Sequence, residues 1–256
     1  MKEPILLGSP GDEIALEIDS VGAVSAVVCC HGFCSERTSG GRFLQLSETL
    51  GSRGFDVIRF DFRGCGDSAD AVLTEASLLD DLLRVLRFAR EHGYRRLYLH
   101  GHSLGSYLCM AVCSRYPEET NDVAALALTG CMTGPMHYDW SLYYSADQMR
   151  ELAETRVLTL TGLRPNDRTT QVSATLLDRF DTVDQAELCN GIVCPTLLIN
   201  GGGDEEERRL AANSVRAISL LPAGSRLLVL SEAPHNFRAQ YPEVTRAVAG
   251  FLQRTL

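Results

Sequence analysis

Short apolar runs alternate with longer segments of helical period along this chain. Six of the apolar runs are expected to form strands, at residues 26–30, 57–60, 97–100, 124–129, 196–200 and 226–230. Continuous apolar runs suit strands that are covered on both faces. Their alternation with helical segments is typical of a parallel sheet with crossover helices.

The segments between these runs predict helices. In residues 78–89, leucine and alanine recur at three- and four-residue steps, which predicts a long amphipathic helix. Further helices are expected at residues 43–50, 104–116 and 244–252. Residues 5–7 and 14–18 are expected to form antiparallel edge strands joined by a turn at Gly11–Asp12. We therefore expect an α/β fold with a mostly parallel, eight-stranded sheet flanked by helices.

One stretch departs from this alternation. Residues 131–189 show no apolar run of strand type, only short amphipathic pieces and turns. An insertion there follows the sixth strand, and the carboxyl ends of parallel strands open onto a ligand crevice. We expect residues 1–130 and 190–256 to form the core, and residues 131–189, the cap segment, to form a small helical cap over the site.

The strongest chemical signal is Gly101-His102-Ser103-Leu104-Gly105. It lies between an expected strand and an expected helix, which is the context that a G-x-S-x-G nucleophile motif requires. The serine of such a motif sits on a sharp, strained turn, and the glycines leave room for close packing. Ser103 is therefore the predicted nucleophile.

A serine hydroxyl needs a base, which His235 in Ala233-Pro234-His235-Asn236-Phe237 is best placed to supply. The acid that orients the imidazole is predicted to be Asp204, which follows Gly201, Gly202 and Gly203 after an expected strand. The glycines would let the backbone turn sharply. Glu205, Glu206 and Glu207 compete with Asp204, although the run also fits a solvated acidic turn.

Acyl transfer also needs hydrogen-bond donors for the developing oxyanion. His31-Gly32-Phe33 leaves an expected strand through a glycine. The backbone N–H groups of Phe33 and Leu104, the latter following the serine, are the expected pair.

These motifs together resemble the α/β-hydrolase superfamily over essentially the whole chain. The likeness is greatest to the branch of monoacylglycerol lipases, serine-aminopeptidase-like hydrolases and bacterial feruloyl (cinnamoyl) esterases. It is carried by His31-Gly32-Phe33, by Phe60-Asp61-Phe62-Arg63-Gly64-Cys65-Gly66-Asp67-Ser68, by the serine motif, by Asn200-Gly201-Gly202-Gly203-Asp204 and by Pro234-His235-Asn236-Phe237.

The resemblance implies that Asp61 and Asp67 support the loop beside the oxyanion hole. Many relatives have a valine-proline pair after the acid, where this chain has Glu205-Glu206-Glu207. The resemblance therefore predicts an acid loop that is more mobile or wetter than in those relatives.

The cap segment is rich in aromatic residues, with Trp140 close to Tyr138, Tyr143 and Tyr144. Aromatic side chains supply a large apolar surface with a few polar tips. The residues expected to contact substrate are Phe33, His102, Tyr138, Trp140 and Tyr143. The alternative is that the cap aromatics form only the cap's own small core.

The predicted function is hydrolysis of a carboxylic ester with an apolar or aromatic group, through an acyl-enzyme. The same triad also serves thioesterases, amidases or peptidases, C–C hydrolases and acyltransferases. Two further classes stay open because fold does not fix function. One is a non-hydrolytic cyclase or lyase that uses the histidine as base, and the other is a catalytically silent binding protein.

The composition of the chain excludes some classes of binding partner and cofactor. The formal charge of -9 disfavours nucleic acid and anionic membranes as partners. No apolar stretch is long enough to span a bilayer, and the N-terminus lacks the apolar core of a signal peptide, so we expect a cytoplasmic protein. We expect a small-molecule ester or acyl substrate and allow for a homodimer. The nine cysteines follow no metal-ligand spacing, and neither do His31, His100 and His102, so we expect no metal and no cofactor.

Overall fold

A computed structural model describes residues 3–163 and 167–256 of the chain. Its main feature is an eight-stranded sheet in the order β1-β2-β4-β3-β6-β7-β10-β11. β1 and β2 pair antiparallel, β2 pairs antiparallel with β4, and all the other neighbours run parallel. The strands are β1 (Ile5–Leu7), β2 (Ile14–Asp19), β3 (Ser25–Cys30), β4 (Asp56–Phe60), β6 (Arg96–His102), β7 (Val123–Thr129), β10 (Thr196–Gly201) and β11 (Arg226–Leu230). The expected mostly parallel sheet is confirmed.

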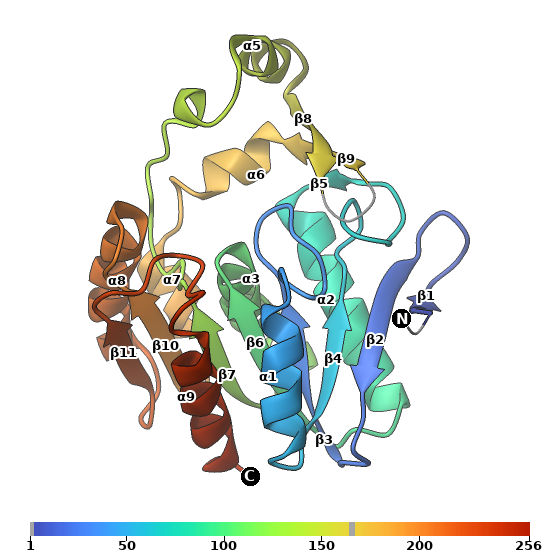
Figure 1. The fold of residues 1–256 in the computed structure, drawn as a ribbon, viewed down its shortest axis with the longest axis vertical. Helices are drawn as coiled ribbons and strands as arrows, with labels where there is room; N and C mark the ends of the chain where they lie inside the picture. The colour runs from blue at the N-terminus through green and yellow to red at the C-terminus, as the bar shows by residue number, and fades with distance from the viewer. Residues whose placement is uncertain (1–2, 164–166) are drawn as a thin grey trace.

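Helices cover both faces of this sheet (Figure 1). One face carries α1 (Arg42–Gly51) and α9 (Tyr241–Gln253), and the other carries α2 (Glu75–Glu91), α3 (Leu104–Arg115) and α8 (Glu205–Ala217). The short helices near these are α4 (Pro117–Thr120), α7 (Gln185–Asn190) and η2 (Ile218–Leu220). All six residues of β3 are buried, because alternate side chains enter the two hydrophobic cores on either side.

The chain between β7 and β10 forms the upper part of the molecule in Figure 1. It contains η1 (Trp140–Leu142), α5 (Ala146–Thr155), β8 (Val157–Leu163), β9 (Arg168–Ser173) and α6 (Ala174–Arg179). β9 lies between β8 and the short β5 (Val72–Leu73) in a separate three-stranded sheet. The insertion therefore follows the sixth strand of the main sheet, as expected.

The expectation that residues 131–189 contain no strand is wrong. β8 alternates buried Leu158 and Leu160 with less buried Val157 and Thr159, the pattern of a strand with one solvated face. Continuous apolar runs mark strands buried on both faces, so a strand that alternates buried and solvated residues does not stand out by that pattern. The cap segment is mixed in structure rather than helical.

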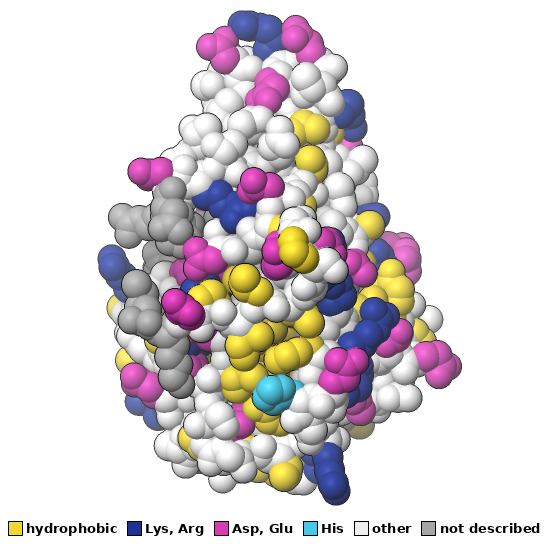
Figure 2. Space-filling model, turned by 90° about the vertical axis from the view of Figure 1, so that its right-hand side faces the viewer, with side chains coloured by type: hydrophobic (Ala, Val, Ile, Leu, Met, Phe, Trp, Pro, Cys, Tyr) yellow, Lys and Arg dark blue, Asp and Glu magenta, His cyan; other side chains and the backbone are white. Residues whose placement is uncertain are grey.

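Figure 2 looks onto the side of the molecule where β1 ends the sheet, and hydrophobic side chains gather there among charged ones. Ile5 and Leu6 of β1 are exposed, as befits a short strand at a sheet edge. In the described part of the chain, no helix has the length and apolar character needed to cross a membrane.

Candidate active site

The turn between β6 and α3 places Ser103 at the carboxyl edge of the parallel strands. Ser103 has φ 55° and ψ −123°, a conformation that costs energy in any residue with a side chain. The flanking glycines make this turn possible, since a Cβ on Gly105 would lie 2.1 Å from the Cys30 carbonyl oxygen. A Cβ on Gly101 would lie 2.4 Å from the Gly105 carbonyl oxygen. The predicted strand-turn-helix context of Ser103 is therefore present.

His235 lies against Ser103, as the sequence predicts. Its Nε2 is 3.0 Å from the Ser103 Oγ, a hydrogen-bond distance, and its ring comes from the loop that follows β11. The ring is 23% exposed. This geometry lets the imidazole take the hydroxyl proton.

The carboxylate at the other ring nitrogen belongs to Glu207, not to Asp204. Glu207 Oε1 lies 2.5 Å from His235 Nδ1, and Glu207 Oε2 accepts a hydrogen bond of 2.5 Å from the Gly201 N–H. The Glu207 side chain has no exposed surface. A carboxylate on Nδ1 holds the proton there and leaves Nε2 free to accept the Ser103 proton.

Asp204 instead caps helix α8, so the prediction that it contacts the imidazole is wrong in this structure. Its Oδ1 accepts a 2.8 Å hydrogen bond from the Glu207 N–H, and its Oδ2 accepts one of 2.8 Å from the His235 N–H. Both oxygens are therefore engaged with backbone donors. Asp204 fixes the start of the helix and the backbone of His235, which are positioning tasks.

The sequence contains a signal that points to Glu207. Aspartate followed three residues later by glutamate is the spacing of a helix N-terminus. From there, Glu207, Leu210, Ser214 and Ala217 recur at helical spacing, and all four are buried. Reading the glutamate run as part of a helix, rather than as a solvated turn, would have placed Glu207 on the inner face. The predicted wetter acid loop is contradicted at Glu207 for the same reason.

The three glycines before Asp204 also act differently from the prediction. None of them has a positive φ. A Cβ on Gly201 would lie 2.0 Å from the Ala233 carbonyl oxygen, and one on Gly203 would lie 2.7 Å from that of Glu232. The glycines thus allow the acid loop to pack directly on the histidine loop.

Charges around the imidazole set its basicity. Burial by itself lowers the pKa of His235, but the hydrogen bond to Glu207 and the charges of Glu206, Glu207 and Asp204 outweigh it and raise that pKa above its ordinary value of 6.5. Glu206 Oε1 lies 3.8 Å from Nε2, on the Ser103 side of the ring. The carboxylates therefore favour the imidazolium that forms when the serine gives up its proton.

The two predicted oxyanion donors are free to act. Among residues 3–163 and 167–256, the N–H groups of Phe33 and Leu104 have no hydrogen-bond acceptor. The Gly32 carbonyl binds the Ser35 N–H and His31 Nδ1, and the Ser103 carbonyl accepts from the Ser106 N–H. Because a trans peptide holds its C=O and N–H in opposite directions, the Phe33 and Leu104 N–H groups point away from these contacts.

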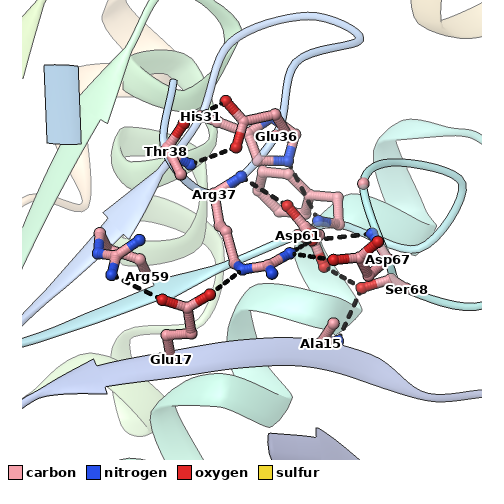
Figure 3. A network of polar contacts seen from close by, with 12 residues as sticks. Ala15, Glu17, His31, Glu36, Arg37, Thr38, Arg59, Asp61, Asp67 and Ser68 are labelled. Atoms are coloured by element: carbon pink, nitrogen blue, oxygen red, sulfur yellow. Dashed lines mark hydrogen bonds and ion pairs between the residues drawn. The ribbon is translucent and has the colours of Figure 1, made fainter. Parts of the chain in front are cut away.

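An ion-pair network holds the loop that carries Phe33 (Figure 3). The buried Asp61 accepts from both the Arg37 N–H and Arg37 Nη1, each at 2.5 Å. Arg37 also binds Asp67 at 2.8 Å and Glu17 at 2.7 Å. A Cβ on Gly66 would lie 2.1 Å from the Asp61 carboxyl carbon. This is the supporting role that the resemblance implies for Asp61 and Asp67.

A pocket of about 330 Å³ opens above Ser103. Its aromatic lining residues are Phe33, Tyr138, Trp140, Tyr143, Tyr144 and Phe180. All five residues predicted to contact substrate, Phe33, His102, Tyr138, Trp140 and Tyr143, line this pocket. Phe180 lines it as well, and no sequence motif points to that residue. The Trp140 and Tyr138 rings stack with centroids 4.9 Å apart.

The cap aromatics also contact the acid helix. The Tyr138 hydroxyl donates a 2.5 Å hydrogen bond to Glu206 Oε1, which joins the cap segment to the first turn of α8. Because these aromatic rings pack on one another and also line the pocket, they form the cap's small core and the pocket wall at once. The two alternatives stated from sequence are therefore not exclusive.

Comparisons with known proteins agree with this fold. The family model of the alpha/beta hydrolase fold matches residues 25–161, more than half of the chain, so the chain belongs to that family. The lysophosphatidylserine lipase ABHD12 of Danio rerio is 31% identical over 108 residues, which are 42% of this chain and 28% of that protein. The chain thus spans less than a third of the length of this curated relative.

Solved structures resemble the whole chain at low sequence identity. Est1E of Butyrivibrio proteoclasticus with bound ferulic acid superposes with a TM-score of 0.76 and 18% identity, covering 98% of each chain. The Paleococcus ferrophilus monoacylglycerol lipase gives a TM-score of 0.74 and 18% identity, over 95% of this chain and 100% of that one. These likenesses establish the fold.

Proposed function

We propose that this protein is a serine hydrolase that cleaves a carboxylic ester carrying an apolar or aromatic group. One observation carries the proposal: Ser103 Oγ, the His235 ring and the Glu207 carboxylate form a continuous chain of contacts of 3.0 and 2.5 Å. A serine, an imidazole and a buried carboxylate in this order are the parts of a nucleophilic triad. Relatives and structural neighbours that include lipases support an ester as substrate.

The reaction runs in two halves. His235 Nε2 takes the Ser103 proton as Oγ attacks the ester carbonyl, and the oxyanion accepts hydrogen bonds from the Phe33 and Leu104 N–H groups. The alkoxide leaves with the proton from His235, and an acyl-serine remains. Water then gives a proton to His235 and attacks the acyl carbon, after which Ser103 regains its proton and the acid departs.

The aromatic pocket supports the substrate class. Its rings offer a large apolar surface next to the nucleophile. We expect a panel of p-nitrophenyl esters, from acetate to decanoate with a cinnamate ester, to show turnover that rises with the apolar surface of the acyl group. The same panel with protein first blocked by a serine-directed phosphonate is the control.

Thioesters and amides of the favoured acyl group complete that panel. Faster turnover of a thioester or amide than of the matched ester would mean that the same triad serves a thioesterase or an amidase. No turnover of any acyl substrate would overturn the proposal.

The pH dependence follows from the raised pKa of His235. The base must be neutral to accept a proton, so kcat/KM falls as the pH drops through that pKa. Because the carboxylates raise it, we expect the midpoint of the acid limb above 6.5 for the intact protein. We expect a lower midpoint in Glu207→Gln, where the charge and the acceptor on Nδ1 are lost. Profiles from pH 5 to 9 with a neutral ester measure both, and equal midpoints would contradict this account of the imidazole.

A further inference from the structure

A second cavity of about 480 Å³ adjoins the Ser103 pocket. Ser35 and Arg42 line both spaces, so the two cavities meet at these residues. Among the described residues, the lining of the second cavity contains two arginines, Arg42 and Arg238, and no acidic residue. The reaction derived above uses neither arginine.

Arg42 is a partly buried cation whose hydrogen-bond partners among the described residues are all uncharged. Its Nε donates to the Ser39 carbonyl and its Nη2 to the Ser39 hydroxyl, both at 2.9 Å, and its Nη1 donates to the Asn236 carbonyl at 3.0 Å. Nη1 also lies 3.2 Å from His102 Nε2. Burial and the nearby Arg42 charge lower the pKa of His102 well below its ordinary value, so this ring is neutral and accepts the hydrogen bond.

Arg37 and Arg63, two other partly buried arginines, are paired with carboxylates. Arg37 binds Glu17, Asp61 and Asp67, and Arg63 binds Asp12, Asp80 and Asp81. Within the described ranges, no carboxylate lies at ion-pair distance from the partly buried Arg42 or from Arg238, which is exposed. A buried cation ordinarily needs a paired anion, and Arg42 lines a cavity with room for one.

The charged residues differ between the two cavities. The pocket beneath the cap segment has aromatic walls, the carboxylate of Glu206 and, on the side that it shares with the second cavity, Arg42. The second cavity has Arg42 and Arg238 and, among the described residues, no carboxylate. The Asn236 carbonyl, which accepts from Arg42, belongs to the residue directly after His235, so the second cavity begins next to the reacting groups.

We propose that this second cavity binds an anionic group, a carboxylate or a phosphate, carried by the ester substrate and held by Arg42 and Arg238. The inference rests on the proposed function and specifies its substrate class, an ester with an apolar part and an anionic part. The apolar part lies among the cap aromatics, the scissile carbonyl lies at Ser103, and the anion lies against the guanidinium groups. Arginine suits both anions because its planar donors match their oxygens.

Matched ester pairs test this site. We compare monooctanoylglycerol with its 3-phosphate and with the monooctanoyl ester of glycerate, at low and high salt, in intact protein and in Arg238→Gln and Arg42→Gln/Arg238→Gln. We expect kcat/KM to favour an anionic ester about a hundredfold or more, and this preference to fall about tenfold in the single variant and further in the double variant. Added salt should weaken it. The phosphate and glycerate arms tell the two anions apart.

Arg246→Gln is the charge-matched control, because Arg246 is exposed on α9 outside both cavities. It should leave the anionic preference unchanged. A preference that is absent, or that all variants keep, would overturn the proposed anion site while Ser103-dependent hydrolysis of neutral esters still supported the proposed function.

Calorimetric titration gives a readout that needs no turnover. Ser103→Ala is titrated with glycerol 3-phosphate and with glycerate, with and without Arg238→Gln. Binding that Arg238→Gln weakens supports the site even if no ester is hydrolysed. Absence of binding of both probes, together with no anionic preference in catalysis, would overturn it.

Discussion

Replacing Ser103 by alanine is expected to lower kcat for the favoured ester about a million-fold, down to the rate that binding and the oxyanion donors alone sustain. The change removes one oxygen, the atom that lies 3.0 Å from His235 Nε2 and becomes acylated. Alanine fits the strained turn no worse than serine does, so the protein should fold. Substrate affinity should change little, because the aromatic pocket is intact. Steady-state kinetics with a p-nitrophenyl ester measure the loss.

Ser35→Ala provides the matched control, since Ser35 lines the same pocket and has no hydrogen bond to His235. We expect Ser35→Ala to stay within about tenfold of the intact protein on a neutral ester, the scale of one neutral hydrogen bond. Equal losses in the two variants would mean that the serine effect is one of packing, and residual turnover in Ser103→Ala near that of the intact protein would exclude Ser103 as the nucleophile.

Replacing Glu207 by glutamine should lower kcat about ten-thousand-fold, the loss seen when a triad carboxylate becomes an amide. The Gly201 N–H requires an acceptor and so directs the amide oxygen toward itself. The NH₂ group then faces His235 Nδ1, which must become an acceptor. The proton moves to Nε2, where it points at Ser103 and blocks the base. The variant keeps the shape of the buried side chain, so kinetics can be compared at equal folded fraction, checked by thermal unfolding.

Asp204→Asn is the comparison that separates the two acids. Asparagine is a good helix N-cap, and its oxygen still accepts from the Glu207 N–H. Only the acceptor for the His235 N–H is lost, so we expect a loss of about tenfold. A larger loss in Asp204→Asn than in Glu207→Gln would reverse the assignment and restore Asp204 as the acid.

Much of the fold could be predicted because β3, β4, β6, β7 and β10 are buried on both faces and so appear as continuous apolar runs. The edge strand β11 is also a continuous apolar run, although most of its residues are not buried. The nucleophile could also be predicted from the sequence, because the structural constraints on Ser103 are local. The turn, its two glycines and the following helix are adjacent in the sequence.

The acid could not be chosen by distance along the chain. Asp204 and Glu207 are three residues apart and both reach His235, one its backbone and the other its ring. Which of them meets the imidazole depends on where α8 begins, because a residue at the cap has its oxygens engaged with backbone N–H groups. The choice is thus a question of helix register, which the polar composition of the glutamate run obscured.

The cap and the second cavity needed the tertiary structure. β9 pairs with residues 72–73 in register with Gln171 and Val172, a contact across about a hundred residues that no local pattern predicts. Phe180 meets Trp140 and Phe33 from a third segment of the chain. Likewise, Arg42 and Arg238 converge only because α1 and the loop before α9 lie on the same face of the sheet.

The most direct test of the central claim is mass spectrometry of the protein after reaction with a p-nitrophenyl alkylphosphonate. The account predicts one covalent phosphonyl group per chain, located on Ser103, with release of one p-nitrophenol. It also predicts that the rate of labelling falls strongly in His235→Ala and Glu207→Gln and only slightly in Asp204→Asn. The proposal that these side chains act as one catalytic unit would be contradicted by the absence of an adduct or by an adduct on another residue. It would also be contradicted if Ser103 were labelled at the same rate in His235→Ala as in the intact protein.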